Sequence, residues 1–162
     1  MTTTSSVPAL QGTATVNLPQ SEAFSFFTRS IGSWWPNEYH IGQADMVDTV
    51  LEPRVDGRWY ERGADGSECD WGRVLVWEPP HRLVVTWQIN GHWQFDDDPQ
   101  RASEIEVRFV ADGPGVTRVT LDHRHLDRLV QGQAMHDQIA GGGGGWGTVL
   151  DRFAGTAEET GQ

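Results

Sequence analysis

Short segments of alternating apolar and polar residues follow one another through the middle of the chain, with turn residues between them. This alternation is typical of half-buried strands. The segments lie at residues 13–18, 46–51, 57–62, 71–77, 82–89, 103–111 and 116–123. Because the connections are short, consecutive strands must run in opposite directions. The sequence therefore predicts an antiparallel meander.

Other stretches carry apolar residues at helical spacing. One follows Pro19, and a shorter one spans residues 31–35, where Pro36 ends it. Near the end of the chain the same spacing covers residues 126–140 and 146–153, interrupted by five consecutive glycines at 141–145. Each glycine costs about 1 kcal/mol relative to alanine in a helix interior. We therefore expect a flexible break there, and a hinge over a cavity mouth is the functional hypothesis for the same segment.

A single domain accounts for the 162 residues. We expect an α+β domain over residues 11–155, with a disordered tail at 1–10 and a polar tail at 156–162. Two short helices follow the first strand, and about six further strands precede the final long helix. A strongly bent sheet of six or seven strands would use that helix to cover its concave face. Any space left between them would form a ligand cavity.

The charge balance excludes several classes of partner. The chain has 12 basic side chains against 23 acidic ones, which argues against nucleic acid and anionic membranes. Every basic residue is arginine, so lysine chemistry is excluded. The single cysteine, Cys69, cannot form an internal disulfide, and no stretch approaches the roughly 20 apolar residues of a membrane span. We expect a cytoplasmic monomer or homodimer.

Eight tryptophans are the most informative side chains, because rings either fill a core or line a pocket. Strand alternation places large rings of three neighbouring strands on one face, together with Glu61, Arg73 and His123. At least half of these rings are expected to pack the core. A cleft of apolar residues with a few polar groups is the usual form of a small-molecule site. The candidate ligand-binding residues are Trp34, Trp35, Trp59, Glu61, Trp71, Arg73, Trp87, Trp93, Phe109, His123 and Trp146.

Motifs for metal, nucleotide or covalent chemistry are weak. His123, His125 and His136 offer a three-histidine metal alternative, but we expect no metal and no cofactor. The chain has neither a G-x-S-x-G elbow nor a phosphate loop. The acidic loop at 96–98 lacks calcium-site spacing and is interpreted as a solvated turn.

Several segments together resemble a known superfamily. They include Ser33 to Pro36, Leu51 to Glu61, Trp71 to Val74 and Trp77 to Pro80, and later Glu104 to Val110. In this order the set is similar to the START-like (SRPBCC) helix-grip superfamily, in the branch related to the activator of the heat-shock ATPase chaperone. The resemblance runs from about residue 13 to 153. It implies a curved antiparallel sheet that grips a long C-terminal helix.

A narrower resemblance is to START-domain proteins of enediyne antibiotic clusters, which include a calicheamicin self-sacrifice resistance protein. It rests on Trp34 to Asn37, Gly57 to Glu61, Trp87 to Gly91, Phe109 to Gly113 and Asp122 to Arg128. This resemblance implies a polyketide-like ligand and a role in antibiotic biosynthesis or self-resistance. In a self-sacrifice mechanism a diradical takes hydrogen from a backbone glycine, for which Gly113 is the candidate.

We therefore expect a non-catalytic protein that binds a hydrophobic or aromatic, polyketide-like molecule in an internal cavity. The first alternative is an enzyme, an aromatic polyketide cyclase or dehydratase, in which His123 and Glu61 would act as general acid and base. The second alternative is a co-chaperone that activates an ATPase, suggested by the family resemblance alone.

Overall fold

The computed structural model describes residues 7–36, 39–141 and 145–160. Its strands form one antiparallel sheet in the order β1-β7-β6-β5-β4-β3-β2. They are β1 (Leu10–Val16), β2 (Met46–Leu51), β3 (Arg58–Gly63), β4 (Glu68–Glu78), β5 (Arg82–Trp87), β6 (Ser103–Ala111) and β7 (Thr117–Arg124). From β2 to β7, neighbours along the chain are neighbours in the sheet, and β1 pairs with β7. The predicted meander is confirmed.

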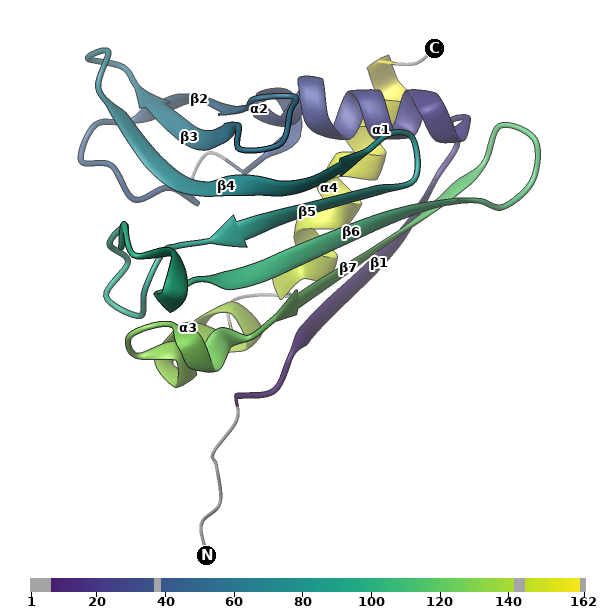
Figure 1. The fold of residues 1–162 in the computed structure, drawn as a ribbon. Helices are drawn as coiled ribbons and strands as arrows, with labels where there is room; N and C mark the ends of the chain where they lie inside the picture. The colour runs from purple at the N-terminus through teal and green to yellow at the C-terminus, as the bar shows by residue number, and fades with distance from the viewer. Residues whose placement is uncertain (1–6, 37–38, 142–144, 161–162) are drawn as a thin grey trace, which may run out of the picture.

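The helices lie mainly on one face of this curled sheet. They are α1 (Gln20–Arg29), α2 (Ile31–Trp34), α3 (Gly132–Gly141) and α4 (Gly145–Thr160), with two short 3-10 turns, η1 (Pro99–Arg101) and η2 (Leu126–Arg128). Figure 1 shows α4, in yellow, crossing behind the sheet, and α4 contacts β1 and the other three α-helices. The α+β helix-grip fold expected from the sequence is confirmed.

Apolar spacing explains how α4 seats against the sheet. Val149, Leu150 and Phe153 recur at helical intervals and expose 3% or less of their surface. The Phe153 ring meets Phe27 of α1 and Trp34 of α2 edge-on, with centroids 5.1 and 5.3 Å apart. Burying each such side chain contributes roughly 1.5–3 kcal/mol, so packing rather than helix propensity holds α4 in place.

The structure corrects the predicted ends of the domain. Strand β1 begins at Leu10, inside the segment predicted as a tail, whose residues 1–6 lie outside the described residues. Helix α4 continues to Thr160, through most of the predicted polar tail. Ala157 is fully buried, and the Glu158 carboxylate accepts a hydrogen bond from the backbone N–H of Asn17. The C-terminal turns are therefore part of the domain.

The long helix predicted at 126–140 is wrong in its first half. His125 and Gln131 have positive φ angles of 62° and 56°, which a right-handed helix cannot accommodate. The chain instead forms η2 and a turn before α3. Of the five-glycine run, residues 142–144 lie outside the described residues, whereas Gly141 ends α3 and Gly145 begins α4.

Two β-bulges interrupt β4, and the first of them overturns the predicted orientation of Arg73. Trp59 pairs with Gly72 and Tyr60 with Asp70, which leaves Trp71 as an extra residue in β4. Leu75 is a second extra residue, because Val74 and Val76 pair with adjacent residues of β5. An extra residue reverses the inward and outward alternation that follows it. Arg73 is consequently exposed on the outer face and does not share a face with Trp71, which is buried.

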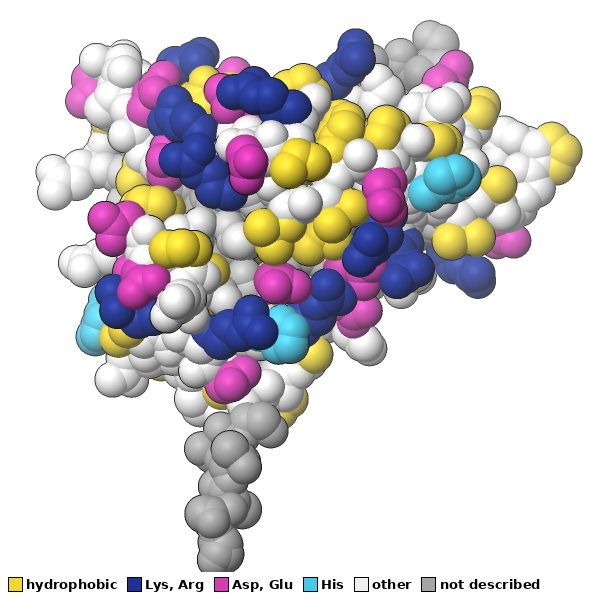
Figure 2. Space-filling model, in the orientation of Figure 1, with side chains coloured by type: hydrophobic (Ala, Val, Ile, Leu, Met, Phe, Trp, Pro, Cys, Tyr) yellow, Lys and Arg dark blue, Asp and Glu magenta, His cyan; other side chains and the backbone are white. Residues whose placement is uncertain are grey.

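The outer face of the sheet carries mixed charge rather than a basic patch. Figure 2 shows arginines interspersed with acidic side chains on the face turned away from α4. Glu106 is the buried centre of one group, in contact with Arg82, Arg108 and Arg124. None of the described helices combines the length and apolar character needed to cross a membrane.

Candidate functional site

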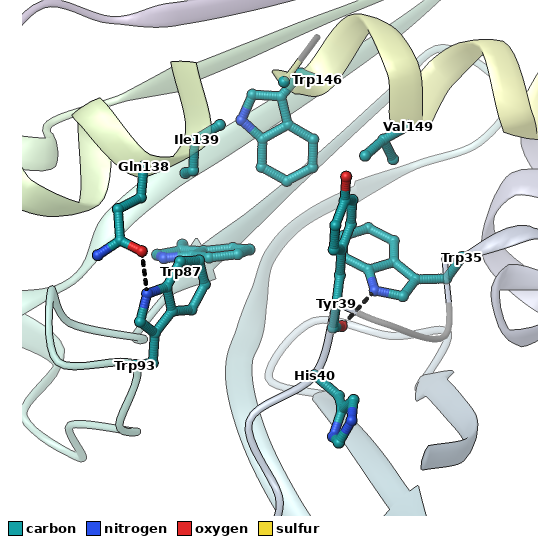
Figure 3. A pocket seen from close by; sticks show the side chains of 10 residues that line it. Trp35, Tyr39, His40, Trp87, Trp93, Gln138, Ile139, Trp146 and Val149 are labelled. Atoms are coloured by element: carbon teal, nitrogen blue, oxygen red, sulfur yellow. Dashed lines mark hydrogen bonds between the residues drawn. The ribbon is translucent and has the colours of Figure 1, made fainter. Parts of the chain in front are cut away.

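A pocket of about 300 Å³ opens at one end of the sheet. Its walls come from five parts of the chain: the residues after α2, the end of β5, the turn after β5, helix α3 and the first turn of α4. Figure 3 shows their side chains surrounding a common space, with His40 at its edge. The lining residues are Trp35, Tyr39, His40, Trp87, Trp93, Gln138, Ile139, Gly145, Trp146 and Val149.

All four indole N–H groups of the pocket donate hydrogen bonds within the protein. The donor and acceptor pairs are Trp35 to the Tyr39 carbonyl (2.9 Å), Trp87 to the Ile89 carbonyl (3.0 Å), Trp93 to Gln138 Oε1 (2.7 Å) and Trp146 to His123 Nδ1 (3.2 Å). The indoles therefore present ring faces and edges to the pocket, which suits stacking against a flat apolar molecule.

His123 lies directly behind two of these indoles. Its ring centroid is 5.3 Å from Trp87 and 5.7 Å from Trp146, and the residue is fully buried. Nδ1 accepts from Trp146, so Nε2 carries the proton and donates to Ser103 Oγ at 2.8 Å. The Ser103 hydroxyl in turn donates to the Trp87 carbonyl at 3.2 Å. This chain of hydrogen bonds fixes the Trp146 indole, the backbone of Trp87 and the tautomer of the imidazole.

The same surroundings keep His123 neutral. Its pKa is lowered from 6.5 to about 3, mainly by burial and to a smaller extent by the charge of His136. The imidazolium would lose hydration and would force Nδ1 to face the Trp146 N–H as a second donor. His123 does not line the pocket. It supports the pocket wall from behind.

Glu61 organises the opposite side of the pocket. It exposes 1% of its surface, and its Oε1 accepts hydrogen bonds from Trp71 Nε1 at 2.9 Å and from the Ile41 backbone N–H at 2.7 Å. Its Oε2 lies 3.3 Å from His40 Nδ1. Glu61 thereby anchors the segment that carries Tyr39 and His40, and it reaches the pocket only through His40.

Trp93 closes the exposed side of the pocket. It occupies the turn after β5 with φ of 60°, an unusual conformation for a bulky residue, and 38% of its surface is exposed. Its bond to Gln138 joins this turn to α3. The turn is also held by Gly91, whose N–H donates to the Val130 carbonyl at 2.9 Å and whose missing Cβ leaves room for Gln131.

The predicted ligand-binding residues separate into three groups. Trp35, Trp87, Trp93 and Trp146 line the pocket. A second set of side chains is buried in the core or behind the pocket wall. That set comprises Trp34, Trp59, Trp71, Phe109, Glu61 and His123, each exposing 3% or less of its surface. Arg73 alone of the predicted residues points to the outer face.

The deep interior is more nearly filled than the sequence suggests. The space beneath the sheet has a volume of about 20 Å³, roughly that of one water molecule, and is lined by apolar side chains that include four indoles. Trp59 fills part of it, with its ring 5.7 Å from Trp35 and 5.2 Å from Trp71. The expected cavity is thus displaced toward the end of the sheet, where α3 and the Trp93 turn form its rim.

Gly113 lies far from this pocket. It belongs to the turn between β6 and β7, has φ of 115°, and an added Cβ would meet no atom within 4 Å. Strand β6 runs from Ser103, beside the pocket wall, to Ala111, next to this turn. At about 3.4 Å per residue its two ends are roughly 27 Å apart. A molecule in the pocket does not reach Gly113.

Sequence analysis missed several pocket residues. Tyr39 and His40 stand in an irregular segment with no periodicity. Gln138 and Ile139 face the pocket from α3, a segment predicted as helix without an assigned face. The spacing of Trp146 and Val149 was the available signal on α4. Across residues 7–36, 39–141 and 145–160, no three His, Cys, Asp or Glu side chains are close enough to hold a metal ion.

The fold and the pocket define an α+β protein of the helix-grip type, in which the sheet and the C-terminal helix meet at an aromatic pocket. The family model described as "Activator of Hsp90 ATPase homolog 1-like protein" matches residues 17–158, and the chain belongs to this family. A comparison with curated proteins gives no match.

Two solved structures are similar in both sequence and fold. An anthrahydroquino-γ-pyrone synthase, Txn09, solved in complex with SUM, is 40% identical, with a TM-score of 0.67 over 93% of this chain and 97% of that one. The self-sacrificing resistance protein CalC from Micromonospora echinospora is 32% identical, with a TM-score of 0.64 over 94% and 96%. Protein NE0264 from Nitrosomonas europaea, at 17% identity and a TM-score of 0.64, shares the fold.

Proposed function

We propose that the protein binds a flat, aromatic, polyketide-like small molecule in the pocket between Trp35, Trp87, Trp93 and Trp146. The observation that carries this proposal is a space of about 300 Å³ with four indole rings in its walls, all of whose N–H groups are already bonded. Such walls favour stacking over hydrogen bonding. The volume is at the lower end of the range of ligand pockets, which suits a compact ring system.

The two more similar relatives support this ligand class. One is named as the synthase of an anthrahydroquinone fused to a γ-pyrone, and the other is named as a self-sacrificing resistance protein. The first name describes a fused aromatic ring system, the second a role in resistance, and both chains are matched over almost their full length. We place the protein accordingly in antibiotic biosynthesis or self-resistance.

Tryptophan fluorescence tests the proposal directly. Titration with anthraquinone should quench the emission to saturation, and native mass spectrometry should find one molecule per chain. Trp93→Ala should weaken binding about tenfold, because it removes one wall of the pocket. Trp77→Phe is the matched control, since Trp77 packs against Phe24 and does not line the pocket. Equal affinity in the two variants would refute this site.

A cyclase that acts on an aromatic polyketide is the second candidate. The name of the 40% identical synthase favours it. In this candidate His40, which lines the pocket, replaces His123 as the base, because His123 is enclosed behind Trp87 and Trp146. Turnover of a linear aryl polyketone that disappears in His40→Phe and survives in His123→Gln would establish it. Binding of the polyketone without turnover would exclude the cyclase and favour the binding function.

The remaining hypotheses draw less support from the geometry. Self-sacrifice at Gly113 requires a ligand roughly 27 Å from the pocket, so exposure to a diradical-forming drug should leave that peptide bond intact. The co-chaperone hypothesis rests on the family description alone. Stimulation of a heat-shock ATPase by the purified protein would support it.

A further inference from the structure

Three side chains lining the pocket, besides the indoles, offer polar atoms to a ligand: Tyr39, His40 and Gln138. The Gln138 carbonyl oxygen already accepts from Trp93. His40 differs from the other two because a buried carboxylate lies behind it. Its Nδ1 is 3.3 Å from Glu61 Oε2, and Glu61 is itself held by bonds from Trp71 and Ile41.

This arrangement favours one tautomer of the His40 imidazole. A carboxylate beside Nδ1 favours the tautomer with its proton on that atom, which leaves the Nε2 lone pair free. Nδ1 of His40 is buried and makes no hydrogen bond to the described residues, so the Glu61 carboxylate 3.3 Å away acts on it through its charge, whereas 23% of the side chain is exposed. No hydrogen bond to Nε2 is found among the described residues, and the ring lines the pocket. Nε2 is therefore available to a hydroxyl donor.

We propose that His40, held in this tautomer by Glu61, accepts a hydrogen bond from an acidic hydroxyl group of the ligand, a phenol or an enol. The pocket then selects hydroxylated flat aromatics over their O-alkylated counterparts. A ligand with carbonyl groups alone lacks the donor that Nε2 requires. Glu61 is a positioning residue, and His40 is a binding residue. This inference rests on the proposed function, because the same pocket holds the ring system.

The test compares 2-hydroxyanthraquinone with 2-methoxyanthraquinone at pH 7 in the full-length protein. The hydroxyl compound should bind about tenfold more tightly, the effect of one hydrogen bond to a strong acceptor. Its visible absorption should shift to longer wavelength on binding, because the phenol O–H bond is polarised toward the imidazole. Failure of both compounds to bind would refute the proposed function. Binding of both with equal affinity and no spectral shift would overturn this inference alone.

Two variants separate a binding role from a structural one. His40→Phe should bind both compounds equally and lose the spectral shift, while it keeps the affinity for 2-methoxyanthraquinone. Glu61→Gln should also lose the preference, because the new amide N–H would donate to Nδ1 and move the ring proton to Nε2. Its amide oxygen can still accept from Trp71 and Ile41, so the segment stays anchored.

The control is His81→Phe, since His81 contacts Gln20 and does not line the pocket. It should retain the tenfold preference and the spectral shift. If the preference survives in His40→Phe but is lost in Gln138→Leu, then Gln138 recognises the hydroxyl group and the proposal is overturned. If His40→Phe does not fold, the comparison of the two anthraquinones in the native protein and in Glu61→Gln still decides.

Discussion

Acidification should destabilise the protein through one side chain, His123. Its imidazole is fully buried, accepts a hydrogen bond from Trp146 and donates one to Ser103. Burial lowers its pKa to about 3, while the unfolded chain has the ordinary value of 6.5. Between these values the unfolded state binds a proton that the folded state excludes. The contribution of His123 to the free energy of unfolding therefore has its full value above pH 6.5 and decreases as the pH drops toward 3.

The magnitude follows from the two pKa values. At pH 5 an unfolded histidine with pKa 6.5 is almost fully protonated, while His123 in the folded state with pKa about 3 is almost fully neutral. The difference in proton binding lowers the free energy of unfolding by about 2 kcal/mol between pH 7.5 and pH 5, at 1.36 kcal/mol per pKa unit. The loss continues to about pH 3, where the folded-state imidazole begins to accept the proton.

Urea denaturation at pH 7.5, 6 and 5 measures this loss, with His123→Gln as the reference. Glutamine can donate to Ser103 but does not titrate, so the variant should be less stable at pH 7.5 and should depend less on pH. The wild-type curve minus the variant curve isolates His123 from the other histidines. If both proteins lose the same free energy between pH 7.5 and pH 5, the imidazole is not held neutral and the reasoning fails.

Three substitutions extend the test to the rest of the structure. Gly72→Ala should lower the free energy of unfolding by about 2 kcal/mol in urea, because its Cβ would overlap the Thr86 carbonyl oxygen; an unchanged midpoint would contradict the close approach of β4 and β5. Trp146→Phe should cost about 1–3 kcal/mol, because His123 Nδ1 would lose its donor, and a fully stable variant would argue against this bond. Gly113→Ala should cost about 1 kcal/mol because its φ is 115°, yet leave the affinity for anthraquinone unchanged; weaker binding would place the ligand elsewhere.

Alternation and turn residues were sufficient to predict the sheet. Apolar periodicity identified β6 with its observed bounds, because Ile105, Val107 and Phe109 face the core without a bulge. The same argument failed on β4. Its two extra residues, Trp71 and Leu75, are set by pairing with β3 and β5, and no local pattern marks such shifts.

The candidate site was predictable in kind but only partly in detail. Period-two spacing shows which face a tryptophan occupies but not how deep along the strand it lies. Trp59 and Trp87 therefore looked equivalent, although the first fills the interior and the second lines the pocket. The Glu61–His40 pair joins a strand to an irregular segment twenty-one residues earlier. Such a contact depends on tertiary packing, and sequence analysis had paired Glu61 with His123 instead.

The chain of hydrogen bonds from Trp146 through His123 and Ser103 to Trp87 has a consequence for how fast a ligand exchanges. It ties α4, β7, β6 and β5 together away from water, so separating them would leave buried groups without partners. The bond between Trp93 and Gln138 is exposed, and solvent can replace it at little cost. Entry and escape should thus occur past Trp93, which sets the residence time, while the indoles braced by His123 set the strength of the stacking.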